Sequence, residues 1–427
     1  KLTLNEAIKI ALQRNSTLVQ TKNSIESNKS QLKSAYGDLM PNLGVNGSWG
    51  WQRIQDAGGK QLNYYGEEEE LPASTTDSRN WSLSAGGGFT LFNGLANYAN
   101  ISQSKNTLEA AEFSLEKLKQ DIIYQTTEFY YSVLNTDAIR NVREENVKYN
   151  EKLLETIQER NKLGSVPIAD VYAQQVQLGN AELLLIQAEN DFDQAKITIL
   201  NFLALDVLDE YEFIDPFENI DKFYEDLDLN EFNDISSMVA EALNLRLDYK
   251  SQLLNLESAD DGITIAKSGL YPRLTGSYSY VTSALRAKDL FNRESYNIGM
   301  TLSIPIFSNW DTENQIQFAE VQYKNTQEDV FTLERQIKIE VKQGYLNLLA
   351  AKKSLEVARK NVVAGEENRR INYERYSLGS GTILDVLQSD RDFTQALSDR
   401  INAEFEFYKG RDNLLNALGK LDYKKFE

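Results

Sequence analysis

The sequence predicts a mixed, mainly helical fold in which long antiparallel coiled-coil hairpins are combined with four alternating strands. Three observations predict it. A block of helix, two strands and helical hairpin occurs twice along the 427 residues. Each strand alternates apolar and small polar side chains, with the period of two that a pleated strand requires. Each hairpin carries apolar residues every seven positions, which is typical of helices that coil around one another.

The repeat is clearest at the predicted turns of the hairpins. The same three residues stand there, 215 positions apart: Leu163, Gly164, Ser165 and Leu378, Gly379, Ser380. Each tripeptide is followed by an isoleucine, an aspartate and a valine at the same spacing. Glycine and proline commonly end helices, so these turns divide each long helical stretch into two antiparallel arms.

The repeat divides the chain into four parts. The first copy is residues 1–205, and its helix, two strands and hairpin are expected at 3–37, 41–53, 80–92 and 94–203. The second copy is residues 234–420, and the corresponding elements are expected at 234–270, 272–283, 294–307 and 309–418. An acidic segment, residues 206–233, joins the copies, and a C-terminal tail, residues 421–427, follows the second.

The four predicted strands have one apolar face and one small polar face. In the first strand Val45, Trp49 and Trp51 alternate with Asn46 and Ser48, and the other three strands follow the same rule. Each run has about the 9 to 11 residues that cross a bilayer as a tilted strand, with aromatic residues near its ends. This alternation is typical of an outer-membrane β-barrel. The alternative is a soluble antiparallel sheet, but the helices leave no predicted layer to cover its apolar face.

Four strands do not close a barrel, for which about eight are the minimum. The chain is therefore expected to associate with copies of itself. The residues alone allow assemblies of two, three or four chains. The apolar faces of the strands are expected to contact the lipid of the outer membrane.

The hairpins carry a shared heptad pattern. Along the two arms of the first hairpin it consists of Ile101, Leu108, Leu115, Ile122, Phe129 and of Val171, Leu178, Leu185, Phe192, Ile199. The second hairpin keeps the spacing, interrupted at Arg400. The first arm is about 70 residues long, roughly 105 Å of helix at 1.5 Å per residue, too long for a compact domain. An elongated coiled-coil scaffold of the cell envelope without channel activity is the alternative, which the strands and the short turns oppose.

Composition excludes several functions. The chain has no histidine and no cysteine, so disulfides, thiolate metal sites and Ser-His or Cys-His nucleophiles are excluded. The 45 basic and 64 acidic residues leave a net charge of −19, which would repel nucleic acid. No stretch approaches the roughly 18 to 20 apolar residues of a membrane-spanning helix. No enzymatic activity, cofactor or metal is expected.

Three features together carry a resemblance to a known family: the order of the elements, the duplicated Leu-Gly-Ser-x-x-Ile-x-Asp-Val turns, and a proline before the strands of each copy, Pro41 and Pro272. In these features the chain resembles the TolC family of outer-membrane efflux proteins. The resemblance covers nearly the whole chain. It implies that three chains form one channel, with four strands from each chain in a shared twelve-stranded transmembrane β-barrel. It also implies that the hairpins form an α-barrel tunnel, and that the protein lies in the outer membrane of a Gram-negative bacterium with a long periplasmic extension.

The function that the resemblance implies is a passive exit duct of a tripartite efflux or type I secretion system. A periplasmic adaptor, or membrane fusion protein, would couple the duct to an inner-membrane transporter. The residues implied to contact the adaptor lie at the hairpin tips: Leu163, Gly164, Ser165, Leu378, Gly379 and Ser380.

The resemblance also implies a gate. In the family's closed state, aspartates of the second hairpin ring the periplasmic aperture within a Thr-Ile-x-Asp-Val-Leu-Asp pattern. Asp385 matches the first ring here, and Gln388 replaces the aspartate of the second. Asp390 lies about 200° further around the helix and is not expected to substitute. Asp385 has a second, local role open to it, because it stands three residues after Thr382 at a helix start.

Some family members hold the tip closed by links from a tyrosine and an arginine of the second copy to an aspartate of the first. The matching positions are Tyr376, Gly381 and Asp170. The tyrosine link is therefore expected in this chain, and the arginine link is not. Asp170 also stands three residues after Pro167, where a carboxylate suits the first turn of a helix.

Two acidic segments complete the prediction. Residues 206–234 hold twelve acidic residues and one lysine, a net −11, and are expected to form solvated surface. Glu67–Glu70 lie in the enlarged loop between the first two strands. This loop is expected on the extracellular side, either partly covering the barrel mouth or disordered and variable.

Overall fold

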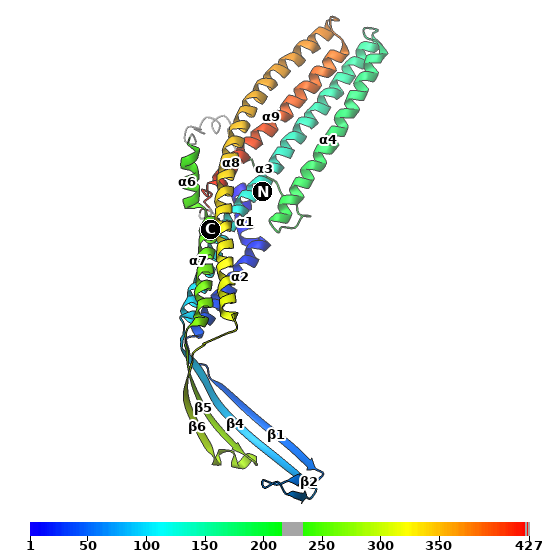
Figure 1. Ribbon diagram of the computed structural model, residues 1–427. Helices are drawn as coiled ribbons and strands as arrows, with labels where there is room; N and C mark the ends of the chain where they lie inside the picture. Colours follow the sequence, from blue (N-terminus) through cyan, green and yellow to red (C-terminus); the bar gives the residue numbers. More distant parts are fainter. Residues whose placement is uncertain (216–233, 423–424, 426–427) are drawn as a thin grey trace. The chain divides into compact units, whose positions relative to one another are not determined.

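The computed structural model describes residues 1–215, 234–422 and 425 (Figure 1). The chain forms two compact units. Unit 1 comprises residues 1–25, 110–253 and 329–427, and unit 2 comprises residues 26–109 and 254–328. Most of the predicted acidic segment, residues 216–233, and most of the tail beyond residue 422 lie outside the described residues.

The compact units do not follow the division that the repeat predicts. Each unit combines residues of both predicted copies, because the long helices α3 (Ala96–Lys162) and α8 (Asp311–Ser377) run from unit 2 into unit 1. Their partners in the hairpins are α4 (Ile168–Phe202) and α9 (Ile383–Ala417). The long arms have 67 residues each and the short arms 35.

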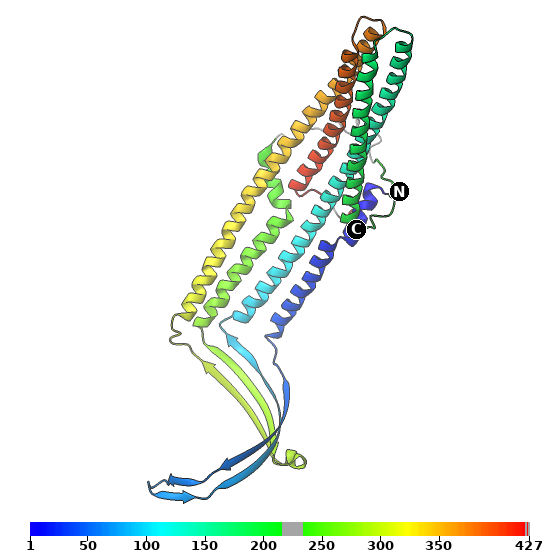
Figure 2. The same ribbon diagram turned by 90° about the vertical axis from the view of Figure 1, so that its right-hand side faces the viewer.

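The heptad positions supply the core between the helices of unit 1. Ile122, Val171 and Ile199 of the first hairpin are buried, as are Phe407 and Leu414 of the second. In Figure 2 the two hairpin turns lie at the same end of this unit. A small apolar cluster at that end contains residues from all four arms: Leu153, Ile157, Val171, Tyr376, Ile383, Val386 and Leu387. The tips are thus packed against each other.

The first predicted helix, 3–37, is two helices in the structure: α1 (Leu4–Arg14) and α2 (Ser16–Gly37). The break lies at Asn15, whose ψ of 122° leaves the helical region. The Asn15 side chain accepts hydrogen bonds from the backbone N–H groups of the next helix, which is how asparagine caps a helix start.

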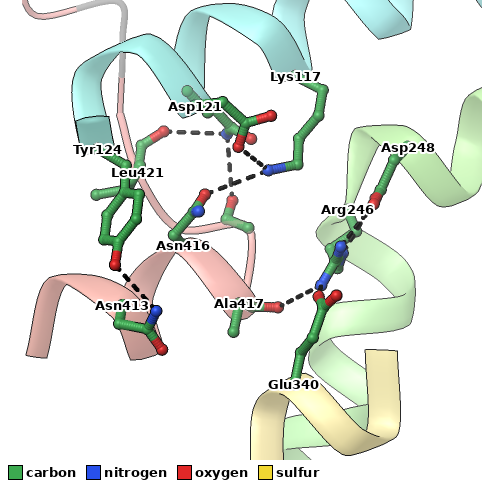
Figure 3. A network of polar contacts seen from close by, with 12 residues as sticks. Lys117, Asp121, Tyr124, Arg246, Asp248, Glu340, Asn413, Asn416, Ala417 and Leu421 are labelled. Atoms are coloured by element: carbon green, nitrogen blue, oxygen red, sulfur yellow. Dashed lines mark hydrogen bonds and ion pairs between the residues drawn. The ribbon is translucent and has the colours of Figure 1, made fainter. Parts of the chain in front are cut away.

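The second predicted helix, 234–270, is also divided. It forms α6 (Ile235–Leu245), α7 (Leu247–Lys267) and a turn of 3₁₀ helix, with a break at Arg246. Arg246 is 5% exposed, and its guanidinium binds Asp248, Glu340 and the last carbonyl of α9 (Figure 3). Buried charged groups require partners of this kind. The break places the Arg246 side chain where three elements meet.

Unit 2 contains a four-stranded antiparallel sheet in the order β1-β4-β5-β6. Its strands are β1 (Gly44–Asp56), β4 (Ser74–Asn93), β5 (Arg273–Ala284) and β6 (Glu294–Ser303). β4 begins six residues before its predicted start, and it pairs with β1 along the whole of β1. Among the described residues, β1 and β6 each have one strand neighbour, so each leaves one edge open.

The register brings the predicted apolar faces onto one side of the sheet. Trp49 stands opposite Trp81, and Tyr280 stands opposite Tyr296. On the other side, glycine, serine, threonine and asparagine form rows across the strands, such as Gly86, Ser279 and Asn297. Many of the apolar side chains remain exposed, among them Val45, Trp49, Trp51, Ile298, Met300 and Leu302. The apolar face is therefore uncovered in the single chain.

The enlarged loop after β1 contains a β-hairpin. It contains β2 (Gly59–Leu62) and β3 (Glu68–Leu71). Of the four consecutive glutamates of the loop, Glu67–Glu70, the last three lie in β3. Lys60 forms a 3.1 Å ion pair with Glu68 across this hairpin. At its turn Tyr64 and Tyr65 are 97% and 85% exposed. The loop between β1 and β4 thus contains a two-stranded sheet of its own.

Candidate functional site at the hairpin tips

Both hairpin turns have the same backbone geometry. Gly164 and Gly379 have φ of +73° and +77°, a left-handed conformation that favours glycine. After each glycine, the serine N–H donates to a carbonyl five residues earlier, at 2.8 Å in the first turn and 2.9 Å in the second. This is the Schellman arrangement that ends a helix. It explains the Gly-Ser pair of the repeated motif.

The leucines of the two turns point into solvent. Leu163 is 81% exposed and Leu378 is 83% exposed, and each directly follows the last residue of a long helix. The backbone geometry of the turn requires the glycine, but nothing in the single chain requires these leucines. An exposed pair of large apolar side chains on adjacent turns is a candidate contact for another protein.

Tyr376 and Asp170 are brought together, as the family resemblance implies. The Tyr376 hydroxyl donates to Asp170 Oδ2 at 2.9 Å and joins α8 to α4. Tyr376 is 6% exposed. Burial raises the pKa of its hydroxyl well above the ordinary value, and the hydrogen bond to Asp170 adds to that shift. The hydroxyl is therefore a proton donor at every physiological pH.

An arginine link that the sequence analysis missed crosses the same contact. Arg160, near the end of α3, donates to the carbonyl oxygen of Ser377 at 2.9 Å. Its guanidinium also lies 5.4 Å from the centre of the Tyr376 ring, a cation–π distance. Gly381 lacks the arginine of the family pattern, and here an arginine of the first hairpin joins the two tips. The sequence gave only a weak sign of this link, because Arg160 is a single arginine three residues before Leu163.

Asp385 caps the first turn of α9. Thr382 Oγ1 and N donate to Asp385 Oδ2 at 2.9 and 3.1 Å, and the Asp385 N–H donates back to the threonine hydroxyl. These hydrogen bonds from Thr382 hold the pKa of the Asp385 carboxyl below its usual value. The carboxylate is exposed and remains charged. The local role is therefore compatible with a role facing an aperture.

Gln388 lies on the same exposed face, one turn after Asp385. Its amide is engaged by neighbours on α9: it donates to Asp392 at 2.7 Å and accepts from Arg391 at 2.9 Å. Asp392 is exposed and stands seven residues after Asp385, hence on nearly the same side of the helix. Asp390 was not expected to substitute for the missing carboxylate, and the family pattern, which ends at Gln388, gave no sign that Asp392 shares the exposed face.

Asp390 is buried and does not join that face. Its carboxylate is turned inward and contacts α3 and α8. The helical angle of about 200° from Gln388 to Asp390 had indicated that Asp390 points to another side of the helix, but it did not indicate which neighbours Asp390 contacts.

Within residues 1–215 and 234–422, no three histidine, cysteine or carboxylate side chains gather as metal ligands would. In the same part of the chain, no helix combines the length and the apolar character that crossing a membrane demands.

Known proteins resemble the chain over almost its full length. The family model described as "Outer membrane efflux protein" matches residues 7–204 and 238–420. The chain is 22% identical over 405 residues to the outer membrane protein TolC of Escherichia coli (strain K12), with 92% of this chain and 77% of the relative covered. It is 20% identical over 386 residues to the pyoverdine export outer membrane protein OpmQ of Pseudomonas aeruginosa, with 89% and 77% covered.

Solved structures show the same fold. The outer-membrane channel OprN superposes with a TM-score of 0.82 at 15% sequence identity, over 99% of this chain and 90% of that one. The open state of the Neisseria gonorrhoeae MtrE outer membrane channel gives a TM-score of 0.79 at 17% identity, over 98% and 90%. The mainly helical chain with its four-stranded sheet thus has the fold of an outer-membrane channel.

Proposed function

Because the chain belongs to the outer membrane efflux protein family, we propose that it is the exit duct of a tripartite efflux or type I secretion system. Three copies would form one channel. The channel would passively conduct substrates that an inner-membrane transporter delivers through a periplasmic adaptor. The chain itself would catalyse no reaction and hold no cofactor.

The protein is an outer-membrane protein of the efflux class. The observation that carries the proposal is the four-stranded sheet. Its apolar face is exposed along β6, where Ile298 is 90% and Met300 is 72% exposed, and β1 and β6 leave open edges. Open edges and uncovered apolar faces favour pairing with further copies and contact with lipid. Three copies supply twelve strands, enough to close a barrel around a lumen lined by the small polar face.

The gate in this proposal is formed at the hairpin tips. Three copies of the exposed Asp385 carboxylate would line the aperture, and Gln388 would stand beside them. Asp392, seven residues further along the exposed face of α9, would supply a second carboxylate ring deeper in the lumen. The Tyr376–Asp170 hydrogen bond and the Arg160–Ser377 hydrogen bond would hold the two hairpins of each chain together in the closed state.

The adaptor would bind at the turns. Leu163 and Leu378 present apolar surface there, while Gly164, Gly379 and the serines beside them, Ser165 and Ser380, shape the backbone. An elongated scaffold without channel activity remains the competing function, and it requires that the apolar sheet face find a partner other than lipid.

The test is the single-channel conductance of the detergent-purified protein in a planar bilayer, for the natural chain and for Asp385→Ala. We expect three chains per particle by native mass spectrometry and a low conductance that rises severalfold in the variant, with weaker cation preference. Protein that stays in solution without detergent and forms no channel would favour the scaffold. A channel with the same conductance in both forms would retain the duct but remove Asp385 from its gate.

A further inference from the structure

Behind the candidate aperture, a buried carboxylate joins the two hairpins. Asp390 is 0% exposed and lies five residues after Asp385 on α9. Its Oδ2 accepts hydrogen bonds from Asn146 Nδ2 at 3.1 Å and from Asn150 Nδ2 at 3.2 Å, both on α3. Its Oδ1 lies 3.4 Å from Arg369 Nη1 on α8. One side chain thus contacts both long arms.

The contact extends to the fourth arm. Gln174 of α4, also 0% exposed, donates from Nε2 to Asn150 Oδ1 at 2.9 Å and to the Asn150 carbonyl at 3.0 Å. Because the Asn150 side-chain oxygen is occupied in this way, its NH₂ group is directed toward Asp390. Gln174 therefore orients the asparagine that holds the carboxylate, and the four arms are joined by one chain of hydrogen bonds.

Arg369 is held in place by two aromatic rings. Its guanidinium lies 4.1 Å from the centre of the Phe393 ring on α9 and 4.8 Å from that of Tyr149 on α3. These are cation–π distances, and they fix the arginine between the hairpins. Asn146 makes a further bond across the interface, to Thr394 Oγ1 at 2.9 Å.

A buried charge of this kind favours one arrangement of the hairpins. Separating α3 from α9 would leave the Asp390 carboxylate without its asparagine donors, in surroundings that solvate a charge poorly. Polar residues at buried coiled-coil positions commonly set register rather than add stability. Asn150 and Gln174 occupy such positions, because Asn150 follows Phe129 by three heptads and Gln174 stands three residues after Val171, the spacing between the two apolar positions of a heptad.

We propose that Asp390 is a positioning residue for the aperture: its bonds to Asn146 and Asn150 latch the second hairpin to the first and hold Asp385 in the closed geometry. The proposal rests on the proposed function as a gated duct. It assigns Asp390 no contact with the conducted substrate, since its side chain is buried. Gln174 and Arg369 complete the latch by orienting its members.

The test compares the single-channel conductance of Asp390→Asn and Asn146→Ala with that of the natural chain. The first variant removes the buried charge, and the second removes donors from the first hairpin while leaving the Arg369 pair intact. We expect each to raise the closed-state conductance at least threefold. Glu367→Gln is the matched control, because it breaks an exposed ion pair within α8, with Arg370, and should leave the conductance unchanged.

A cross-link separates a latch from a general loss of packing. The chain has no cysteine, so Lys152→Cys and Glu366→Cys introduce a unique pair on α3 and α8, where both residues line one groove. Bridging this pair with a flexible bismaleimide should return the conductance of Asp390→Asn to the natural level, because it restores the hairpin contact by other means. If Asp390→Asn does not assemble, the conductance of Asn146→Ala, with and without the cross-link, tests the latch instead.

The outcomes distinguish the latch from the duct. Natural conductance in Asp390→Asn and Asn146→Ala, with raised conductance in Asp385→Ala, would overturn the latch alone. Raised conductance that the cross-link does not reverse would also overturn it, since hairpin separation would not be the cause. A natural chain and an Asp385→Ala variant that both form no channel would overturn the proposed function, and the latch with it.

Discussion

At the scale of single residues, Asp385 at the tip of the second hairpin combines two properties: it takes part in capping a helix, and its carboxylate is exposed. Asp385 caps a helix through Thr382, and the same carboxylate remains exposed and charged. Capping explains why a carboxylate suits this position in any helix. It does not explain the exposure of a neighbouring leucine, Leu384, or of Gln388, which lie on surfaces left open in the single chain.

The capping hydrogen bonds lead to a prediction about pH. They lower the pKa of Asp385, so the carboxylate stays charged until the pH falls through that lowered value, and the stability that the cap contributes is lost over the same range. Thr382→Val removes the hydroxyl bond and moves the pKa of Asp385 upward. We expect the cation preference of the channel to be lost at a higher pH in this variant, as measured by the reversal potential in a salt gradient.

Thr382→Ser is the matched control, because serine keeps the hydroxyl that donates to the carboxylate. Its reversal potential should follow the pH dependence of the natural chain. An identical pH dependence in the valine and serine variants would show that the hydroxyl does not set the charge at the aperture.

At the scale of elements, the breaks in the two shorter helices were not predictable from local pattern. The helical periodicity runs through Asn15 and Arg246, and neither residue is a strong helix breaker. At the break, the Arg246 guanidinium is held by the nearby Asp248 and by two groups from elsewhere in the fold, Glu340 and the carbonyl of Ala417 (Figure 3). Glu340 and Ala417 are distant in sequence, so only the folded chain brings them to Arg246.

The Arg246 cluster leads to a prediction about stability. Burial lowers the pKa of Arg246, but the hydrogen bonds and charges of Asp248 and Glu340 outweigh burial and raise it. Arg246→Met leaves both carboxylates without their cation. We expect it to lower the free energy of unfolding by about 3 to 5 kcal/mol, the cost of removing one partner of a buried ion pair. Urea unfolding of the detergent-solubilised protein, followed by circular dichroism, measures this change.

The control for this variant is Arg370→Met on α8, whose two ion pairs with Glu367 and Glu374 are exposed. Exposed pairs contribute little, so its unfolding midpoint should stay close to that of the natural chain. Equal midpoints for both methionine variants would contradict a stabilising role for the Arg246 cluster.

At the scale of the whole molecule, the single chain exposes surfaces that only an assembly would cover. The apolar face of the sheet and the open edges of β1 and β6 are the clearest. A charge on that face should therefore be costly in a lipid-facing barrel, whereas a charge on the opposite face should not.

Ile298→Arg tests this expectation. Arginine on the lipid face near the middle of the membrane costs about 2 to 4 kcal/mol. We expect a marked loss of trimer from outer-membrane extracts, measured by electrophoresis without heating. Asn297→Arg, on the adjacent position of the same strand and the opposite face, should assemble normally. Equal yields of trimer would contradict the assignment of the apolar face to lipid.

Local periodicity in the sequence was enough to predict the long hairpins, the two faces of each strand and the turns at the tips. Heptads, alternation and glycine at a helix end depend on neighbours within a few residues. The closeness of Tyr376 and Asp170 was expected only through the family resemblance, and the structure shows it. The sheet register then placed the predicted apolar faces on one side.

Only the tertiary structure decided which polar residues join the hairpins. Arg160 and Asp390 look like ordinary charged helix residues in the sequence, but one bridges the tips and the other is buried against Asn146 and Asn150. The division into compact units was equally hidden, since each unit draws on both halves of the chain. These features depend on contacts between residues far apart in the sequence. Local pattern does not specify the geometry of such contacts, because it is set by how the helices pack.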